Sequence, residues 1–304
     1  MNTHISLDSC AFKVSSNYDE RKKPRDRYIE YQQDLYKIAN ATFDESTLLK
    51  GGQYSYTELA NDLLNDLDRK ALGQDVDLMV VSYWTPEFDP DYSALGPYLH
   101  NTLGLQCKSF DVCDCGSVCT LTALSVIRDY MLADESINET LLVGLEQNTI
   151  PLPNPEHAPV PLESGCGIVK IRKDDSGPVL LKHIEIINEH QVAQNDFNPQ
   201  IYLQNLLKNQ AVGIDEVALW VRKDSYFYRA LCHHMHKNPS MLDKLEINFL
   251  RCNYSSMNVF RWLADQVNYP SAKPHALLIE EDLESLEFGS VLFNFDHTNY
   301  DHTQ

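Results

Sequence analysis

Residues 108–149, KSFDVCDCGSVCTLTALSVIRDYMLADESINETLLVGLEQNT, carry the sequence pattern that decides the fold. The apolar segment 109–112 predicts a short strand, and the small residues at 113–117 predict a tight bend after it. Apolar residues then recur every three or four positions over 118–132, which is typical of a helix with one buried face. A second apolar segment, 141–145, predicts another strand. The order strand, bend, helix, strand indicates an α/β protein.

The bend is the candidate site for a nucleophile. A side chain at a strand-to-helix bend is held on a tight turn next to the N-terminus of the following helix. The partial positive charge of that N-terminus favours the anionic form of a thiol or hydroxyl. Cys115, Gly116 and Ser117 are the three candidate positions in this bend.

Three segments frame the bend: Phe110-Asp111-Val112, Ala123-Leu124-Ser125-Val126 and Leu142-Val143-Gly144. Together with the bend they resemble the nucleophile region of the ketoacyl synthase III branch of the thiolase superfamily. That family carries a cysteine on the bend. Counting forward from Phe110 puts the family's position at Gly116, and counting back from Ala123 puts it at Ser117. The bend is about one residue longer than the family pattern, and Cys115 is the nearest thiol, so all three positions stay open.

The segment before the bend extends the resemblance. A helix is predicted over residues 55–71, because Ser55 and Glu58 form a capping-box pattern at its start. A strand at 77–81 follows, as it does in the family. Further towards the N-terminus the chain is polar and weakly periodic, and only a helix at 27–39 is predicted there.

The second half of the chain repeats the first more loosely. Residues 215–221 echo 75–81, 255–267 echo the helix after Ser117, 275–279 echo 141–145, and 288–293 supply a last strand. Alternating strands and helices, present twice, indicate a pseudo-duplicated α/β architecture. The resemblance implies a thiolase-like layered αβαβα fold, with an N-terminal half at residues 1–175 and a C-terminal half at 176–304.

The resemblance also implies the residues of the active site. In the family, a cysteine carries the acyl group, while a histidine and an asparagine stabilise the anion derived from the thioester. Asn253, in the segment Cys252-Asn253-Tyr254-Ser255, takes the family's asparagine role, and Arg222 stands at the histidine position. A guanidinium stays protonated and cannot act as a general base, although it can hold an oxyanion or a carboxylate. Standard decarboxylative condensation is therefore not expected.

Three hypotheses about function follow. In the first, the chain is a non-condensing, ketoacyl-synthase-III-like subunit of a fatty-acid or polyketide-type complex of secondary metabolism. It pairs through strand 109–112 with an intact ketosynthase homologue as a heterodimer, or with itself as a homodimer. In the second, it is an acyltransferase or thioester hydrolase that uses Ser117 or Cys115, with Arg222 and Asn253 as an anion site. Whether the chain is an enzyme stays open between these two.

The third hypothesis is a metal or redox protein built on the cysteines. Cys113, Cys115 and Cys119 form a C-x-C-x3-C pattern, but a zinc site usually has C-x2-C pairs and further ligands. Small thiols that pack around a tight turn are the competing interpretation, and no metal site is predicted. His233 and His236 lie three apart on what is expected to be an ordinary exposed helix. No permanently bound cofactor is expected. The acyl donor implied by the resemblance is acyl-CoA or the phosphopantetheine of an acyl carrier protein.

Composition limits the partners. The formal net charge is −19 over 304 residues, which argues against nucleic acid and anionic membranes as partners. No apolar segment approaches the roughly 20 residues that span a bilayer. The basic segment 21–27 is either a docking site for an anionic carrier or a solvated N-terminal segment. We expect no signal peptide and reduced thiols at the eight cysteines, as in a cytoplasmic protein.

Overall fold

The computed structural model describes residues 4–15, 26–45, 54–84, 94–148, 161, 163–188, 191, 197–235, 244–251, 255–268, 272–282 and 285–295. The strands in these ranges are β1 Ser6–Ser15, β2 Leu78–Tyr83, β3 Lys108–Cys113, β4 Glu139–Glu146, β5 Ser164–Arg172, β6 Val179–Ile187, β7 Val217–Val221, β8 Glu246–Phe249, β9 His275–Glu281 and β10 Phe288–Phe295. They form one mixed sheet in the order β3-β2-β4-β5-β1-β6-β10-β9-β7-β8.

The helices lie on both faces of this sheet. The α-helices are α1 Asp26–Ile38, α2 Tyr56–Leu64, α3 Arg69–Gly73, α4 Leu95–Leu103, α5 Cys119–Ala133, α7 Pro199–Asn209, α8 Tyr226–Met235 and α9 Asn258–Asn268. Three short 3-10 helices are η2 Gly116–Val118, η3 Ile214–Glu216 and η5 Ser255–Met257. Among the described helices, none is long and apolar enough to cross a membrane.

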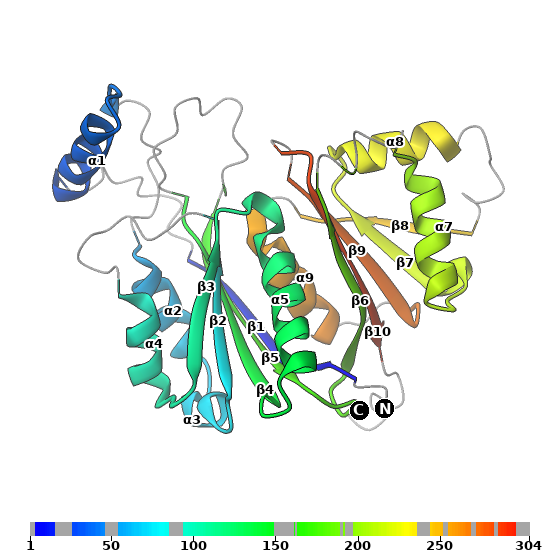
Figure 1. Cartoon of the computed structure of the whole chain (residues 1–304), viewed down its shortest axis with the longest axis horizontal. Helices are drawn as coiled ribbons and strands as arrows, with labels where there is room; N and C mark the ends of the chain where they lie inside the picture. The colour runs from blue at the N-terminus through cyan, green and yellow to red at the C-terminus, as the bar shows by residue number, and fades with distance from the viewer. Residues whose placement is uncertain are drawn as a thin grey trace.

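The sheet folds into two halves around a central helical layer. Figure 1 shows α5 and α9 between the part of the sheet made by β1 to β5 and the part made by β6 to β10. Helices α2 and α4 cover the outer face of the first part, and α7 and α8 cover the second. The layers therefore follow the order αβαβα, which confirms the layered α/β fold expected from the sequence.

The two halves repeat the same strand arrangement. β2 lies parallel to β3 and β4, and β4 is antiparallel to β5. In the second half, β7 lies parallel to β8 and β9, and β9 is antiparallel to β10. The predicted division at residues 175 and 176 falls between β5 and β6. As a domain boundary it stays a prediction.

The structure corrects two expectations. The sequence pattern does not predict β1, yet this strand lies in the middle of the sheet and pairs with both β5 and β6. Most of its residues are half-buried rather than alternating between buried and exposed, so its period-two signal is weak. The helix expected at 55–71 is two helices, because Asp68 accepts hydrogen bonds from the backbone of Lys70 and Ala71 and starts α3. The predicted capping box of Ser55 and Glu58 is present.

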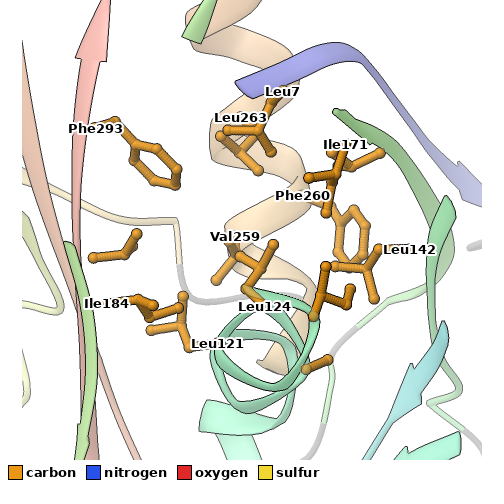
Figure 2. Packing of buried hydrophobic residues seen from close by; sticks show 14 of the residues in the cluster. Leu7, Leu121, Leu124, Leu142, Ile171, Ile184, Val259, Phe260, Leu263 and Phe293 are labelled. Atoms are coloured by element: carbon orange, nitrogen blue, oxygen red, sulfur yellow. The ribbon is translucent and has the colours of Figure 1, made fainter. Parts of the chain in front are cut away.

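The central layer is packed closely against the sheet. Figure 2 shows Leu121 and Leu124 of α5 meeting Val259 and Phe260 of α9 between the strands. The ring of Phe260 lies against two glycines that pair across β4 and β5, Gly144 and Gly167. A Cβ would lie 2.1 Å from the ring at Gly144 and 2.4 Å at Gly167. The two glycines therefore form a depression that seats the ring.

Replacing one of these glycines tests this contact. We expect Gly167→Ala to lower the free energy of unfolding by about 1–3 kcal/mol, because the added methyl overlaps Phe260 and forces the core to shift. The matched control is Gly96→Ala in α4, where an added Cβ meets nothing within 4 Å. The control should leave stability unchanged or raise it by about 0.5–1 kcal/mol, because alanine favours a helix. Chemical denaturation of both variants measures the difference, and equal effects would contradict the packing argument.

Candidate active site

The bend after β3 is a strained turn tied to its surroundings. Asp114 and Gly116 have φ angles of 60° and 54°, in the left-handed region. The Asp114 N–H donates to the Trp84 carbonyl oxygen at 3.0 Å, which ties the bend to the end of β2. A Cβ at Gly116 would lie 2.6 Å from the Asp282 carboxylate. Glycine is required at position 116 by both its φ angle and this approach, so a nucleophilic side chain can come only from a neighbouring position.

Cys119 anchors the start of α5. Its side chain is buried, and Sγ lies 3.2 Å from the Tyr83 carbonyl oxygen and 3.1 Å from the Val112 carbonyl oxygen. These oxygens are at the ends of β2 and β3, so the thiol joins the first residue of the helix to both strands. A hydrogen bond to Cys115, followed by burial, raises the pKa of Cys119 well above its ordinary value. This thiol stays protonated and acts as a donor.

Cys115 is a partly exposed thiol of the bend, as is Cys113. In its neutral form, Sγ donates to the Cys113 carbonyl oxygen at 3.2 Å. A hydrogen bond from Cys119 lowers the pKa of Cys115 to about 7, although burial and the carboxylate of Glu287 act in the opposite direction. α5 begins without a side-chain cap, so its first N–H groups add a favourable field for an anion just before the helix. The lowered pKa makes the thiolate of Cys115 more populated at neutral pH than that of an ordinary cysteine.

The neighbouring bend residues differ from Cys115. Burial, followed by the charge of Asp114, raises the pKa of the Cys113 thiol. Ser117 is only 1% exposed, and its Oγ has no hydrogen-bond partner among the described residues. A serine hydroxyl needs an adjacent base to become a nucleophile, and within the described parts of the chain none reaches Ser117. The structure therefore favours Cys115 over Ser117 on chemical grounds.

Arg222 lies at the end of β7 in a buried ion-pair network. Its Nη2 is 3.2 Å from Asp224 Oδ2, and its Nη1 is 3.5 Å from Glu280 Oε1. Asn258 of α9 donates to the same Glu280 oxygen at 3.3 Å. Two carboxylates of the chain itself thus balance the guanidinium charge. The expected role of Arg222 in holding an anion stays a prediction, and the predicted Asn253 lies outside the described residues.

Glu146 and Asp282 are buried acids at equivalent places in the two halves, and each contacts the other half. Glu146 lies three residues after Val143, which pairs with Val81. Asp282 lies three residues after Ile279, which pairs with Val221. Glu146, from the first half, accepts a hydrogen bond from the Ser256 hydroxyl in η5, and its Oε1 lies 3.2 Å from the Trp84 N–H. Asp282, from the second half, lies against Gly116 in the bend.

Burial raises the pKa of two carboxyls in this region, those of Glu146 and Glu280. Glu146 has no exposed surface, and burial raises the pKa of its carboxyl to about 8. Its second oxygen, Oε2, has no hydrogen-bond partner among the described residues. Burial also raises the pKa of Glu280 to about 7, against the opposing effect of Arg222. Both groups therefore carry a proton over part of the neutral pH range.

These acids are only partly evident from the sequence. Glu146 directly follows the strand predicted at 141–145, and in the structure its Oε1 accepts a hydrogen bond from the Trp84 N–H. Glu280 and Asp282 are missed, although the acidic run 280–282 directly after an apolar strand is an available signal. Within the described ranges, no group of three or more His, Cys, Asp or Glu side chains is arranged to hold a metal ion.

No protein-family model and no curated protein sequence matches the chain. Solved structures do match in fold. One is AbyA1, a tetronic acid condensing enzyme, with a TM-score of 0.63, 12% identity, and 95% of this chain and 99% of that chain covered. Another is the acyltransferase ChlB3, with a TM-score of 0.60, 10% identity, and 96% and 98% covered. A third is the β-ketoacyl-[acyl carrier protein] synthase III of Thermus thermophilus, with a TM-score of 0.57, 12% identity, and 96% and 99% covered.

These likenesses establish the fold. At 10–12% identity over nearly the whole length of each chain, the protein has the thiolase-like α/β fold of ketoacyl-synthase-III-type enzymes. The neighbours include condensing enzymes and an acyltransferase, so the fold is compatible with more than one reaction of acyl groups.

The acidity of Cys115 is open to a direct test. The rate of iodoacetamide alkylation at Cys115 should rise with pH through a midpoint of about 7, because the thiolate is the reacting form. Cys119→Ala removes the donor and should move the midpoint upward. Cys113→Ala is the matched control and should leave it in place. Peptide mapping after timed alkylation gives the rates. A midpoint that is the same in the native protein and Cys119→Ala would rule out this contact as the cause.

Glu146 predicts how stability depends on pH. The pKa of its carboxyl is about 8 in the folded protein and about 4.3 in an unfolded chain, so the folded state binds the proton more tightly. The free energy of unfolding should therefore fall as pH rises from about 4 to 8. Glu146→Gln, which keeps one donor and one acceptor, should make this fall shallower. The exposed Glu135→Gln is the control. Denaturation curves at several pH values measure the slope, and identical slopes in all three proteins would contradict the assignment.

Proposed function

We propose that this protein transfers acyl groups and carries the acyl group on the thiol of Cys115. The observation that supports this most directly is the position of Cys115, partly exposed in a strand-to-helix bend, with a pKa of about 7. A thiol of this acidity, placed before a helix N-terminus, is typical of reactive cysteines.

The proposed step is an exchange of thioesters. The Cys115 thiolate attacks the carbonyl carbon of an acyl thioester, a new C–S bond forms, and the donor thiol leaves as its thiolate. Coenzyme A or the phosphopantetheine of an acyl carrier protein is the proposed donor. Water or a second nucleophile then takes the acyl group from Cys115, which makes the protein a thioester hydrolase or an acyltransferase. Because the acyl carrier is a side chain, the reaction needs no permanently bound cofactor.

The surroundings of Arg222 argue against standard decarboxylative condensation. The resemblance places Arg222 where the family has its histidine, and a guanidinium cannot serve as a general base. Its charge is also balanced by Glu280 and Asp224, so it is less available to a developing anion. A transfer that needs only a thiolate and an acyl donor fits these residues better. A place in fatty-acid or polyketide-type metabolism is part of the proposal, by analogy with the structural neighbours.

A second candidate function is a non-catalytic subunit that supports an active homologue. The exposed edge of the sheet favours this second candidate. β3 forms one edge of the sheet and, among the described strands, pairs only with β2. Next to this edge, Tyr130 of α5 is 47% exposed and lies 5.2 Å from the ring of Phe110 in β3. A partner sheet that adds to β3 would pair the open edge and cover this ring. The partner in this proposal is a second copy of the chain or an intact ketosynthase homologue.

The first candidate function predicts an acyl adduct on Cys115, and the second predicts none. After incubation with acyl-CoAs of several chain lengths, intact-protein mass spectrometry should show one added acyl group, mapped to Cys115. Cys115→Ser should abolish the thioester adduct, because a hydroxyl of ordinary pKa reacts far more slowly than a thiolate. Cys113→Ala and Ser117→Ala are the matched controls and should keep it.

The other outcomes are equally informative. An adduct on Ser117 would mean that Ser117, and not Cys115, is the acyl carrier. If no chain length gives an adduct while the protein forms a heterodimer with a ketosynthase homologue, the acyltransferase proposal fails and the second candidate replaces it.

A further inference from the structure

We propose that a cleft between β1, β5 and α3 binds a free α-amino acid with an apolar side chain. The cleft has a volume of about 460 Å³, which is in the range of small-molecule sites. It lies on the outer face of the first half, where Figure 1 shows α3 at the end of the sheet opposite the start of α5. β4 runs from Glu139 in this cleft to Glu146 at η5, about 20 Å away. The proposal therefore concerns a second site and does not rest on acyl transfer by Cys115.

Two interruptions of regular structure meet at the cleft. The helix predicted over 55–71 is broken into α2 and the short α3, and residues of this break line one wall. On the opposite side, the register of β1 against β5 shifts between Leu7 and Ser9, which inserts Asp8 as a bulge. A β-bulge changes the direction of a side chain and is common next to binding sites. As a result, Asp8 and Ser9 both line the cleft.

Four charged side chains of alternating sign cross the cleft. Lys170 Nζ lies 2.7 Å from Glu139 Oε2, and Arg172 Nε lies 3.2 Å from Glu139 Oε1. Arg172 Nη1 then lies 3.3 Å from Asp8 Oδ1. Lys170 is buried and also donates to the Gln74 carbonyl oxygen at 2.9 Å. The ammonium of Lys170 is therefore committed to the protein itself.

Arg172 is the cation that is left for a ligand. Its side chain is 32% exposed, and neither of its ion pairs has the alignment of a hydrogen bond. Among the described residues, no carboxylate lies within ion-pair distance of its Nη2. A guanidinium presents parallel N–H groups that match the two oxygens of a carboxylate. Arg172 is thus suited to hold the carboxylate of a ligand.

The rim of the cleft carries the opposite charge. Asp68 uses Oδ1 to cap α3, where it accepts from the Lys70 and Ala71 N–H groups. Asp75 is exposed, with a φ angle of 59°. In the part of the chain that the structure describes, neither carboxylate has a cation within ion-pair distance. They are therefore placed to attract an ammonium group.

The remaining wall is apolar, and it includes Leu67, Leu72 and Ile168. A ligand with a carboxylate, an ammonium and an apolar side chain matches all three kinds of surface at once. A phosphate or dicarboxylate would bring a second negative charge towards Asp68 and Asp75. A simple amine would leave the guanidinium of Arg172 unused. A zwitterionic amino acid is the ligand class that fits the cleft best.

Calorimetric titration of the whole chain with L-leucine as the probe tests the proposal. We expect saturable binding of one leucine per chain. Leucinol lacks the carboxylate and 4-methylpentanoate lacks the ammonium, so each should bind at least about ten-fold more weakly, because each loses a charge-assisted contact. Cys115→Ser should bind leucine as tightly as the native protein, which keeps this result separate from acyl transfer.

Variants then place the binding in this cleft. Ser9→Trp fills the cleft without removing a charged group and should weaken leucine binding at least about ten-fold. Asn101→Trp, at an exposed position of α4 outside the cleft, is the matched control and should leave it unchanged. Asp68→Asn combined with Asp75→Asn should weaken the binding of leucine but not of 4-methylpentanoate. Asparagine still caps a helix and still adopts a positive φ, so these two changes keep the backbone intact.

Three results would overturn the proposal. The first is no binding of leucine at millimolar concentration. The second is equal affinity for leucine and for both analogues, which would mean that the charged groups recognise nothing. The third is unchanged leucine binding in Ser9→Trp, which would place the ligand elsewhere. Leucine binding without any acyl adduct on Cys115 would uphold this proposal while removing the proposed acyl transfer.

Discussion

The packing of Phe260 against Gly144 and Gly167 is the contact on which the arrangement of the two halves depends. It brings α9, which belongs to the second half, onto the strands of the first half, next to α5. Since α5 starts at the bend and α9 starts at η5, seating the ring also brings the two helix starts together. The chemistry of the bend therefore depends on a core contact that contains no polar atom.

Carboxylates at the ends of β4 and β9 complete this arrangement. Glu146 binds η5, Asp282 lies against the bend, and Glu281 accepts from the backbone N–H groups of Tyr226 and Phe227 at 2.7 and 2.8 Å, at the start of α8. Negative charge is favourable at the N-terminus of a helix. Burial opposes that benefit, since a carboxyl without full hydrogen bonding keeps its proton. The site thus combines the thiol of Cys115, whose pKa is lowered, with the carboxyls of Glu146 and Glu281, whose pKa values are raised by burial.

The sequence predicts the parts of the fold whose signals are local. Strand β4 is evident because both of its faces are buried and its residues form a continuous apolar segment, and the capping box at Ser55 marks a helix start. Strand β1 is not evident, since its place in the sheet comes from partners far along the chain. The bend is found from sequence, but counting alone cannot separate Cys115 from Ser117. That distinction comes from exposure and from the Cys119 donor, which only the folded chain supplies.

The central place of β1 has a consequence for how the protein is made. β1 is synthesised well before its neighbours in the sheet, β5 and β6, at residues 164–187. The whole segment between β1 and β5 must be synthesised before either edge of β1 is paired. Pairings of such long sequence separation form slowly and leave strand edges open in the meantime. Until β5 and β6 have been synthesised, the unpaired edges of β1 therefore favour aggregation of the new chain.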